Sequence, residues 1–218
     1  PLPWRRLGGG RGGRVARRVA LCGLPPPPVL LWGGPSPLAS YSHRFLNIAD
    51  LRPRKNHLGL LRTWSRATRA DDDAVLILKS TAVHPRTIDI FRRDLAAIGF
   101  SFPSAATVLF MTSMLSDEQL RSLYRSATHY LSMSFGEGWD FPMMEAAVSG
   151  LQLIAPRHTA YCEYLGDDDA ELIPATSVPA IIEGRAGAED RRWFDGARWW
   201  KPDEESAAAV IRSIVDGT

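Results

Sequence analysis

Short apolar runs alternate with helical segments from residue 43 onward, and this alternation constrains the fold more than any other feature of the chain. The runs AVLILK at 74–79 and TVLFM at 107–111 have the length and composition of strands covered on both faces. The segment at 56–68 lies between the apolar runs at 43–49 and 74–79, and it spaces its apolar residues as a helix does. No short hairpin turn joins the runs. The pattern predicts an α/β, Rossmann-like three-layer domain with a parallel sheet of about six strands.

Boundary signals refine the expected elements. Ser116 and Gln119 form a capping-box pattern, Pro202 begins the last helix, and Gly99, Gly150 and Gly217 end helices. The Trp-rich segment before Pro202 is expected to be a loop. We expect strands at 43–49, 74–79, 107–111, 128–133, 151–156 and 170–174, and helices at 56–68, 85–99, 116–127, 142–150, 160–166 and 202–217.

The first 42 residues differ in composition from the rest of the chain. They are rich in Gly, Arg and Pro, which predicts a tail that is disordered or non-native, followed by one domain at 43–218. Residues 1–44 hold seven of the 26 basic residues and no acid, so the remainder has 19 basic against 24 acidic residues. This balance gives no electrostatic reason to expect a nucleic-acid partner, although an Arg-Gly front that binds nucleic acid stays open as a hypothesis.

Cysteine use and hydropathy indicate the compartment. Cys22 and Cys162 are too few and too far apart to suggest a disulfide scaffold or a metal-ligand spacing. No run reaches the roughly 20 apolar residues that cross a bilayer. We therefore expect a reduced, intracellular protein without a transmembrane segment.

Ligands of parallel sheets bind outside the carboxyl ends of the strands, so the loops there are the first candidates. The loop after the first strand carries Arg52, Arg54 and Lys55 directly before a helix. Cationic side chains beside a helix N-terminus make a good anion site. A solvated basic turn is the alternative interpretation.

The loop after the fourth strand reads SFGEGWDFP. Gly136 and Gly138 flank Glu137, which permits unusual backbone angles and close approach of a ligand. Asp140 and Pro142 fit a helix start, and the N–H groups of residues 140–143 are expected to point into the same crevice.

A second carboxylate follows eight positions later, at Glu145. Phe141, Met144, Glu145 and Val148 share one face of the predicted helix, and a carboxylate in such an apolar stripe needs hydrogen-bond donors. A ribose diol supplies two hydroxyl donors. The alternative is that Glu145 faces a neighbouring Arg or a backbone N–H of the protein.

Other candidate groups are weaker. The acidic runs 71–73 and 167–169 precede strands, which places them at the wrong edge of the sheet for a metal-diphosphate site. His158 follows the fifth strand on the crevice side, without partners at metal-ligand spacing. The sequence contains no G-x-G-x-x-G, P-loop, nucleophile elbow or zinc motif, which argues against nicotinamide dehydrogenases and P-loop hydrolases.

Three segments together resemble one protein family. Residues 134–165, SFGEGWDFPMMEAAVSGLQLIAPRHTAYCEYL, resemble the E-x7-E region of retaining glycosyltransferases of the GT-B fold, in particular family 4. FLNIADLRPRKNHLGLLRTW at 45–64 resembles the first strand and basic loop of that family, and LSDEQLRSLYRSATHYLSMS at 115–134 the approach to its signature. The resemblance covers about residues 43–216 and implies the carboxyl-terminal, donor-binding domain.

The resemblance also implies roles for the site residues. Lys55 would contact the diphosphate of a nucleotide sugar, Glu145 the ribose hydroxyls and Glu137 hydroxyls of the transferred sugar, without a nucleophile role. No metal and no cofactor is expected, because Lys55 and a helix N-terminus neutralise the leaving diphosphate. The remaining donor-binding candidates are Gly138, Trp139, Asp140, Phe141, Arg52, Arg54 and His158.

Two positions depart from the family pattern. Asp50 stands where members commonly have Arg, so that Arg52 or Arg54 would have to substitute for it, and Asp140 replaces a common Gly.

The implied function is that of the donor-binding half of a retaining hexosyltransferase-like enzyme in bacterial glycan or surface-polysaccharide assembly, cytoplasmic or peripheral at the inner face of the membrane. An amino-terminal domain would bind the unidentified acceptor, so the isolated chain is expected to be weakly active or inactive. The alternative is a non-catalytic module that binds nucleotide sugar or associates with a partner. Three of the seven Trp residues lie in RRWFDGARWWKP at 191–202, which would supply an exposed aromatic patch.

Overall fold

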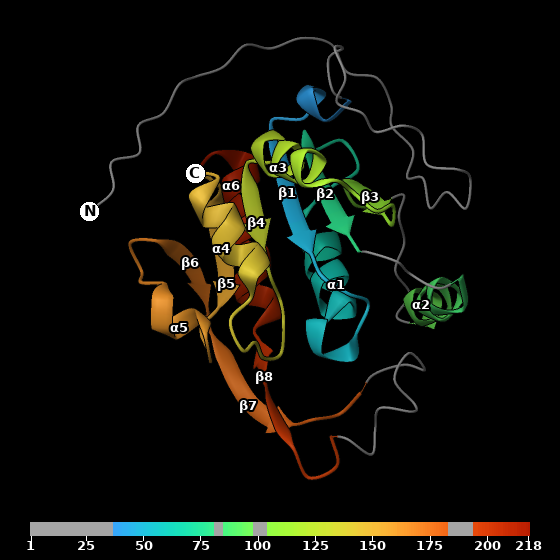
Figure 1. Ribbon diagram of the computed structural model, residues 1–218, viewed down its shortest axis with the longest axis vertical. Coiled ribbons are helices and arrows are strands. Elements are labelled where there is room, and N and C mark those ends of the chain that lie inside the picture. The colour runs from blue at the N-terminus through green and yellow to red at the C-terminus, as the bar shows by residue number, and fades with distance from the viewer. Residues whose placement is uncertain (1–36, 81–84, 98–103, 183–193) are drawn as a thin grey trace.

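A six-stranded sheet in the order β3-β2-β1-β4-β5-β6 organises the chain, and every pairing in it is parallel (Figure 1). The computed structural model describes residues 37–80, 85–97, 104–182 and 194–218. The predicted Rossmann-like α/β class is therefore confirmed. The strands are β1 (His43–Ile48), β2 (Ala74–Lys79), β3 (Thr107–Met111), β4 (His129–Leu131), β5 (Gln152–Pro156) and β6 (Ala170–Ile173).

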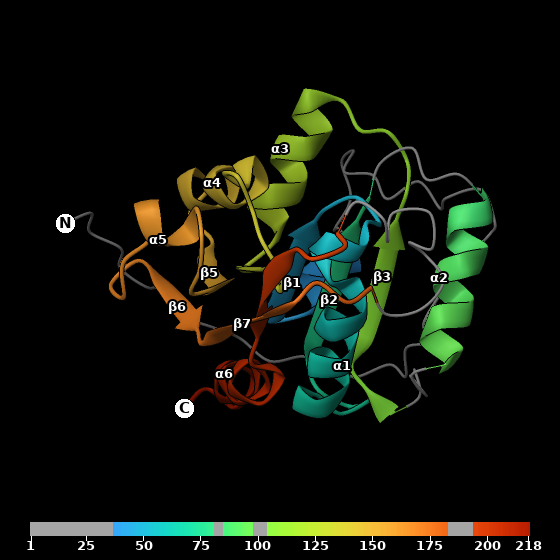
Figure 2. The same ribbon diagram turned by 90° about the horizontal axis from the view of Figure 1, so that it is seen from below.

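Helices cover both faces of this sheet. Figure 2 shows α3, α4 and α5 on one side and α1 and α6 on the other, with α2 beside the β3 edge. The predicted helix-strand alternation thus produces three layers. The helices are α1 (His57–Ala67), α2 (Pro85–Ala97), α3 (Asp117–Ser126), α4 (Phe141–Val148), α5 (Tyr161–Tyr164) and α6 (Glu204–Asp216), with short 3₁₀ turns at Pro37–Ser40 and Pro53–Lys55.

The core consists of one apolar layer on each face of the sheet. All six residues of β2 are buried, as expected for a central strand. Trp64 of α1 is fully buried, and its indole N–H donates to the Ala106 carbonyl at 3.0 Å, so a large apolar side chain keeps its polar atom satisfied. Leu38 and Tyr41, which precede residue 43, are buried in the layer under α3 and α4.

Several boundary predictions are confirmed by the geometry of the helix ends. Ser116 accepts from the Gln119 N–H while the Gln119 side chain accepts from the Ser116 N–H, a complete capping box. Gly217 ends α6 with a left-handed φ of 74°. The predicted helix end at Gly99 and residues 1–36 of the predicted tail lie outside the described residues.

The Trp-rich segment is not a loop throughout, which corrects the sequence prediction. Strands β7 (Ala175–Pro179) and β8 (Arg198–Pro202) pair antiparallel in a second, two-stranded sheet. A long connection separates the two strands, so the sequence contains no short turn motif that would predict their pairing. Pro202 ends β8, and α6 begins after Asp203, whose side chain caps the helix by accepting from the Ser206 N–H at 2.7 Å.

The strand order places the functional edge of the sheet. The chain runs outward from β1 through β2 to β3, then returns to pair β4 on the other side of β1 and runs outward through β5 to β6. Such a switch point opens a crevice between the loops that follow its two central strands, here β1 and β4. The acidic runs precede β2 and β6. Asp72 pairs with Arg212 of α6, and Asp167 pairs with Arg157, which follows β5.

Candidate functional site

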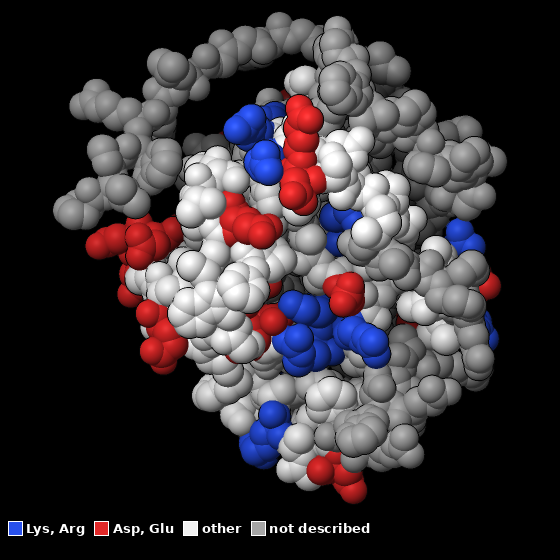
Figure 3. Space-filling model, in the orientation of Figure 1, with Lys and Arg blue, Asp and Glu red and all other residues white. Residues whose placement is uncertain are grey.

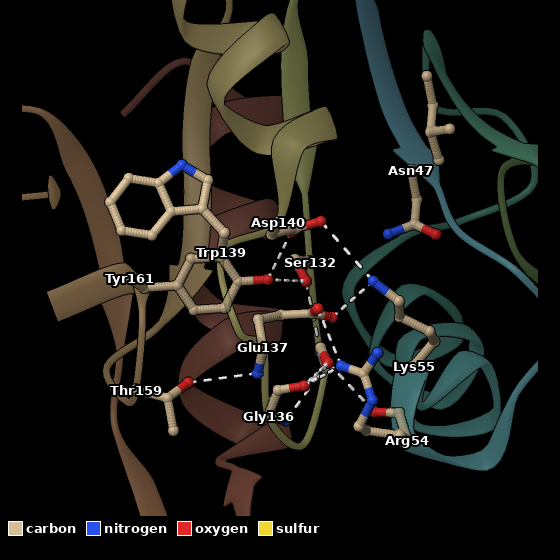
Figure 4. A network of polar contacts seen from close by, with 12 residues as sticks. Asn47, Arg54, Lys55, Ser132, Gly136, Glu137, Trp139, Asp140, Thr159 and Tyr161 are labelled. Atoms are coloured by element: carbon tan, nitrogen blue, oxygen red, sulfur yellow. Dashed lines mark hydrogen bonds and ion pairs between the residues drawn. The ribbon is translucent and has the colours of Figure 1, made fainter. Parts of the chain in front are cut away.

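The loops after β1 and β4 meet through an ion pair between Lys55 and Glu137. The Lys55 Nζ lies 2.7 Å from Glu137 Oε1, and Arg54 Nη1 lies 2.8 Å from Glu137 Oε2 (Figure 4). The Glu137 side chain is only 4% exposed. A carboxylate buried to this degree needs charged partners, and both cations come from the basic loop that the sequence predicted.

Backbone contacts reinforce the junction of these loops. Phe135 N–H donates to the Arg54 carbonyl at 2.9 Å, and Ser134 Oγ donates to the same carbonyl at 3.1 Å. The Arg54 guanidinium also donates to the Gly136 carbonyl. The two loops therefore form one connected unit at the switch point.

Asn56 connects the basic loop to α1 and to the chain after β4 through its side chain. Its backbone is left-handed, with φ 52°, and its side-chain oxygen accepts from the Gly59 N–H at 3.1 Å, so it caps α1. Its Nδ2 donates to the Met133 carbonyl at 2.8 Å, which ties the same residue to the chain after β4. Gly59 leaves room for this cap, because an added Cβ would lie 2.5 Å from the Asn56 side chain.

Asp140 faces the same cation from the start of α4. Its Oδ1 lies 3.7 Å from Lys55 Nζ, and its Oδ2 accepts from the Tyr161 hydroxyl at 2.6 Å. Ser132 Oγ lies 2.8 Å from that hydroxyl and completes the chain of contacts. Figure 3 shows Lys and Arg atoms gathered near the middle of this face, with Asp and Glu atoms beside them.

The backbone around Glu137 corrects one prediction. Neither Gly136 nor Gly138 has a positive φ; the left-handed residue of this loop is Asp140, with φ 61°. This is the conformation that glycine adopts most easily, and it falls at the position where the family commonly has Gly. A Cβ added at either glycine would meet no atom within 4 Å, so the space beside both is open.

The start of α4 offers fewer N–H groups than expected. Asp140 precedes the helix, but its side chain makes no capping hydrogen bond. Pro142 has no N–H, and the Met143 N–H donates to the Asp140 carbonyl at 3.0 Å. Of residues 140–143, at most the N–H groups of Asp140 and Phe141 can reach a ligand.

Glu145 lies on the exposed face of α4, which corrects the inference that its stripe is buried. Phe141 and Val148 of this stripe are 69% and 84% exposed, while Met143 and Ala146 fill the core side. Glu145 Oε2 accepts from the buried Tyr124 hydroxyl of α3 at 2.7 Å. The carboxylate is thus held by a phenol and remains open to solvent.

His158 lies behind the loop of Glu137, not in the open space beside it. It is 3% exposed, its Nε2 lies 2.8 Å from the Ser134 carbonyl, and its Nδ1 lies 2.8 Å from Thr159 Oγ1. Thr159 Oγ1 in turn accepts from the Glu137 N–H at 3.3 Å. This pattern fits a neutral imidazole with its proton on Nε2, which braces the loop.

The remaining candidates divide between the rim and the far side of the site. Trp139 is 41% exposed, and its ring packs against Tyr164 at a centroid distance of 5.2 Å. Arg52 lies with Phe91 and Ile182 along a hollow that neither Lys55 nor Glu137 lines. Trp199 is buried against Phe135, whereas Trp200 is 39% exposed and Trp193 lies outside the described residues.

Protonation equilibria distinguish the two buried carboxylates. Burial alone would raise the pKa of Glu137, but the bonds from Lys55 and Arg54 outweigh it and leave the pKa below its ordinary value. Burial raises the pKa of Asp140, and the hydrogen bond from Tyr161 and the charge of Lys55 offset it only in part.

Sequence reasoning missed the residues that support the charged groups. Asn56 is the first residue of the helix predicted at 56–68, and an Asn at the start of a helix signals a cap, so it could have been found. Tyr124, Ser132 and Tyr161 reach the site through tertiary packing, which carries no local signal. Among the described residues, no three His, Cys, Asp or Glu side chains gather in a way that could hold a metal ion.

Comparison with known proteins gives a distant but consistent set of likenesses. No protein-family model matches the chain. The serotype-specific mannosyltransferase WbdA from Escherichia coli is 26% identical over 129 residues, which are 59% of this chain and 15% of that protein. This chain thus matches only a small part of its curated relative.

Solved structures show likenesses at lower identity. The carboxyl-terminal domain of LpcC, a glycosyl transferase group 1 family protein from Francisella tularensis, is 16% identical, with a TM-score of 0.49 over 81% of this chain and 84% of that one. HepE from Anabaena, solved in complex with UDP, is 14% identical, with a TM-score of 0.47 over 83% of this chain and 45% of that one.

The strand order and the site define the class of the protein. It is a Rossmann-like domain with a charged cluster at the switch point of its parallel sheet. Its sequence resembles carboxyl-terminal domains of GT-B glycosyltransferases, and the curated relative reported above is a mannosyltransferase. In the described ranges, no helix has both the length and the apolarity needed to cross a bilayer.

Proposed function

We propose that the chain binds a nucleotide diphosphate sugar at the switch point and serves as the donor-binding domain of a retaining glycosyltransferase. The meeting of Lys55 with Glu137 across the loops after β1 and β4 carries this proposal. Lys55 and Arg54 would neutralise the diphosphate together with the N-terminus of α4, without a metal or other cofactor. In a transfer reaction this neutralisation stabilises the leaving group.

The two carboxylates of the signature divide the recognition of the donor. Glu145 would accept hydrogen bonds from the ribose hydroxyls, because Tyr124 fixes one of its oxygens and leaves the carboxylate accessible. Glu137 would bind hydroxyls of the transferred sugar, beside the open space at Gly136 and Gly138. We assign Glu137 no nucleophile role, because both its oxygens are already engaged by cations.

Transfer needs an acceptor, and we propose that a separate amino-terminal domain supplies its binding site. Trp139 and Phe141 lie exposed at the edge of the donor site, where a second domain would face it. The mannosyltransferase relative supports a hexose as the transferred sugar. A role in polysaccharide or glycan assembly rests on the same relative.

Isothermal titration of the folded chain with UDP and with GDP tests the binding proposal. We expect heat of binding for at least one nucleotide, and its loss in Glu145→Ala. Circular dichroism establishes that each sample is folded. No heat above background for either nucleotide would overturn the proposal.

Association with a partner protein is a second candidate function, favoured by the exposed stripe of Phe141 and Val148 on α4. Glu145→Ala separates the two candidates, because it removes a donor ligand and keeps the apolar stripe. A partner complex that survives in this variant, in a chain without nucleotide affinity, would support the second function.

A further inference from the structure

The Lys55 ammonium contacts two carboxylates at unequal distances. Its Nζ lies 2.7 Å from Glu137 Oε1 and 3.7 Å from Asp140 Oδ1, and Figure 4 shows both contacts, with Asp140 above Glu137. Glu137 also pairs with Arg54. Among the described residues, Asp140 forms no second ion pair, but it accepts a hydrogen bond from the neutral Tyr161 hydroxyl.

The charges of this cluster cancel before any ligand binds. Arg54 and Lys55 contribute two positive charges, and Glu137 and Asp140 two negative ones. Both carboxylates have side chains exposed by 4% or less. A diphosphate adds further negative charge to this neutral and largely buried group, and uncompensated charge there is unfavourable.

A proton on one carboxyl group relieves the excess charge, and the contacts select Asp140. Protonation of Glu137 would break two direct ion pairs. Protonation of Asp140 at Oδ1 keeps the bond from Tyr161 to Oδ2 and gives up only the longer contact to Lys55. The new O–H can then donate to a phosphate oxygen, as a neutral carboxylic acid does.

We propose that the Asp140 carboxyl group is itself a ligand of the diphosphate, and that it binds as the acid, with one proton taken from solvent on binding and returned on release. This inference rests on the proposed function of the site. It gives Asp140, which stands where the resembled family commonly has Gly, a role in setting the ligand charge that the site accepts. The pKa of Asp140 is raised and the pKa of Glu137 is lowered, and both shifts favour Asp140 as the carboxyl group that takes the proton.

The other titratable groups near Asp140 do not compete for this proton in the neutral range. Burial raises the pKa of the four tyrosines that face it, so they stay protonated. Burial lowers the pKa of His158, and burial with the charge of Lys55 lowers that of His57 to about 4. The four tyrosines are Tyr124, Tyr130, Tyr161 and Tyr164.

Titration calorimetry with UDP-glucose and GDP-mannose tests the inference, because the diester phosphates of these probes do not titrate near neutral pH. Each probe is measured in two buffers of different ionisation enthalpy, from about pH 6 to about pH 8. We expect wild-type protein to take up as much as one proton per ligand, and its affinity to fall as pH rises. Asp140→Asn should take up none and bind about tenfold more tightly than wild type near pH 8, which corresponds to about one pKa unit.

Asp140→Gly is the second variant, because glycine fits the left-handed backbone and also lacks the carboxyl group. It should likewise bind without proton uptake. Wild-type binding without proton uptake, or uptake that persists in both variants, overturns the inference and leaves the donor-binding function intact. Absence of binding by all three folded proteins at every pH overturns both.

Discussion

The Lys55 ammonium lies 2.7 Å from the Glu137 carboxylate, and this contact joins the loop after β1 to the loop after β4. The strand order makes the meeting possible, because β1 and β4 are neighbours although two other strands separate them along the chain. Each of the two loops alone would be an ordinary basic or glycine turn. Together they form a buried charge cluster at the edge where parallel sheets bind ligands.

Lys55→Met should abolish nucleotide binding and also destabilise the fold. Removing Lys55 leaves Arg54 as the one cation paired with Glu137 in the described part of the chain. We expect a loss of about 1–3 kcal/mol in the free energy of unfolding, measured by urea denaturation.

The double variant Lys55→Met with Glu137→Gln separates stability from binding. It removes both charges, so much of the lost stability should return while nucleotide affinity stays absent. Lys201→Met, at an exposed position of β8, is the matched control and should change neither property. Full nucleotide affinity in Lys55→Met would contradict the role of this residue.

Asn56→Ala should destabilise the protein by about 2–3 kcal/mol, since it removes an N-cap and places alanine in a left-handed conformation. Asn56→Gly removes the same hydrogen bonds but relieves the backbone strain, and should recover about 1 kcal/mol. Chemical denaturation of both variants measures the difference. Equal stability of the two would show that backbone strain at this position is unimportant.

Tyr124→Phe should weaken nucleotide binding about threefold to tenfold, because the phenol that holds Glu145 is lost, a change of about 0.5–1.5 kcal/mol. Glu145→Ala should weaken it further. A dideoxyribose analogue of UDP provides the control, since a ligand without ribose hydroxyls should be indifferent to both substitutions. Equal losses for UDP and the analogue would count against ribose as the ligand of Glu145.

Acid should destabilise wild-type protein more steeply than Glu137→Gln. The folded-state pKa of Glu137 lies below its ordinary value, so the ionised side chain stabilises the fold above that ordinary value. This contribution is lost as pH falls through the folded-state pKa. Urea unfolding from about pH 7 to about pH 3 should give the flatter acid limb for Glu137→Gln. Parallel profiles for the two proteins would contradict the assignment.

Much of the fold could be predicted because its signals are local. The buried run at 74–79 and the capping box at Ser116 identify their elements without tertiary information. The basic loop and Glu137 were found because strand ends of a parallel sheet share one edge. In contrast, β7 and β8 pair across a long connection, so their antiparallel contact had no turn signal to reveal it.

The detailed geometry of the site was less predictable. The stripe containing Glu145 has helical spacing whichever face is buried, and the burial of Met143 and Ala146 decided its orientation. The left-handed backbone falls on Asp140 instead of either neighbouring glycine, because Tyr161 and Lys55 hold its side chain from elsewhere in the fold. Such contacts depend on residues that only folding brings together.

Backbone amide chemical shifts during a titration with UDP or GDP test the central claim most directly, because they locate the nucleotide on the chain. We expect the largest shifts in residues 52–56 and 132–141, the two loops that meet at the switch point, and their loss in Lys55→Met. Shifts that cluster away from these loops, along α6 or the β7–β8 sheet, would contradict the claim that nucleotide binds between β1 and β4.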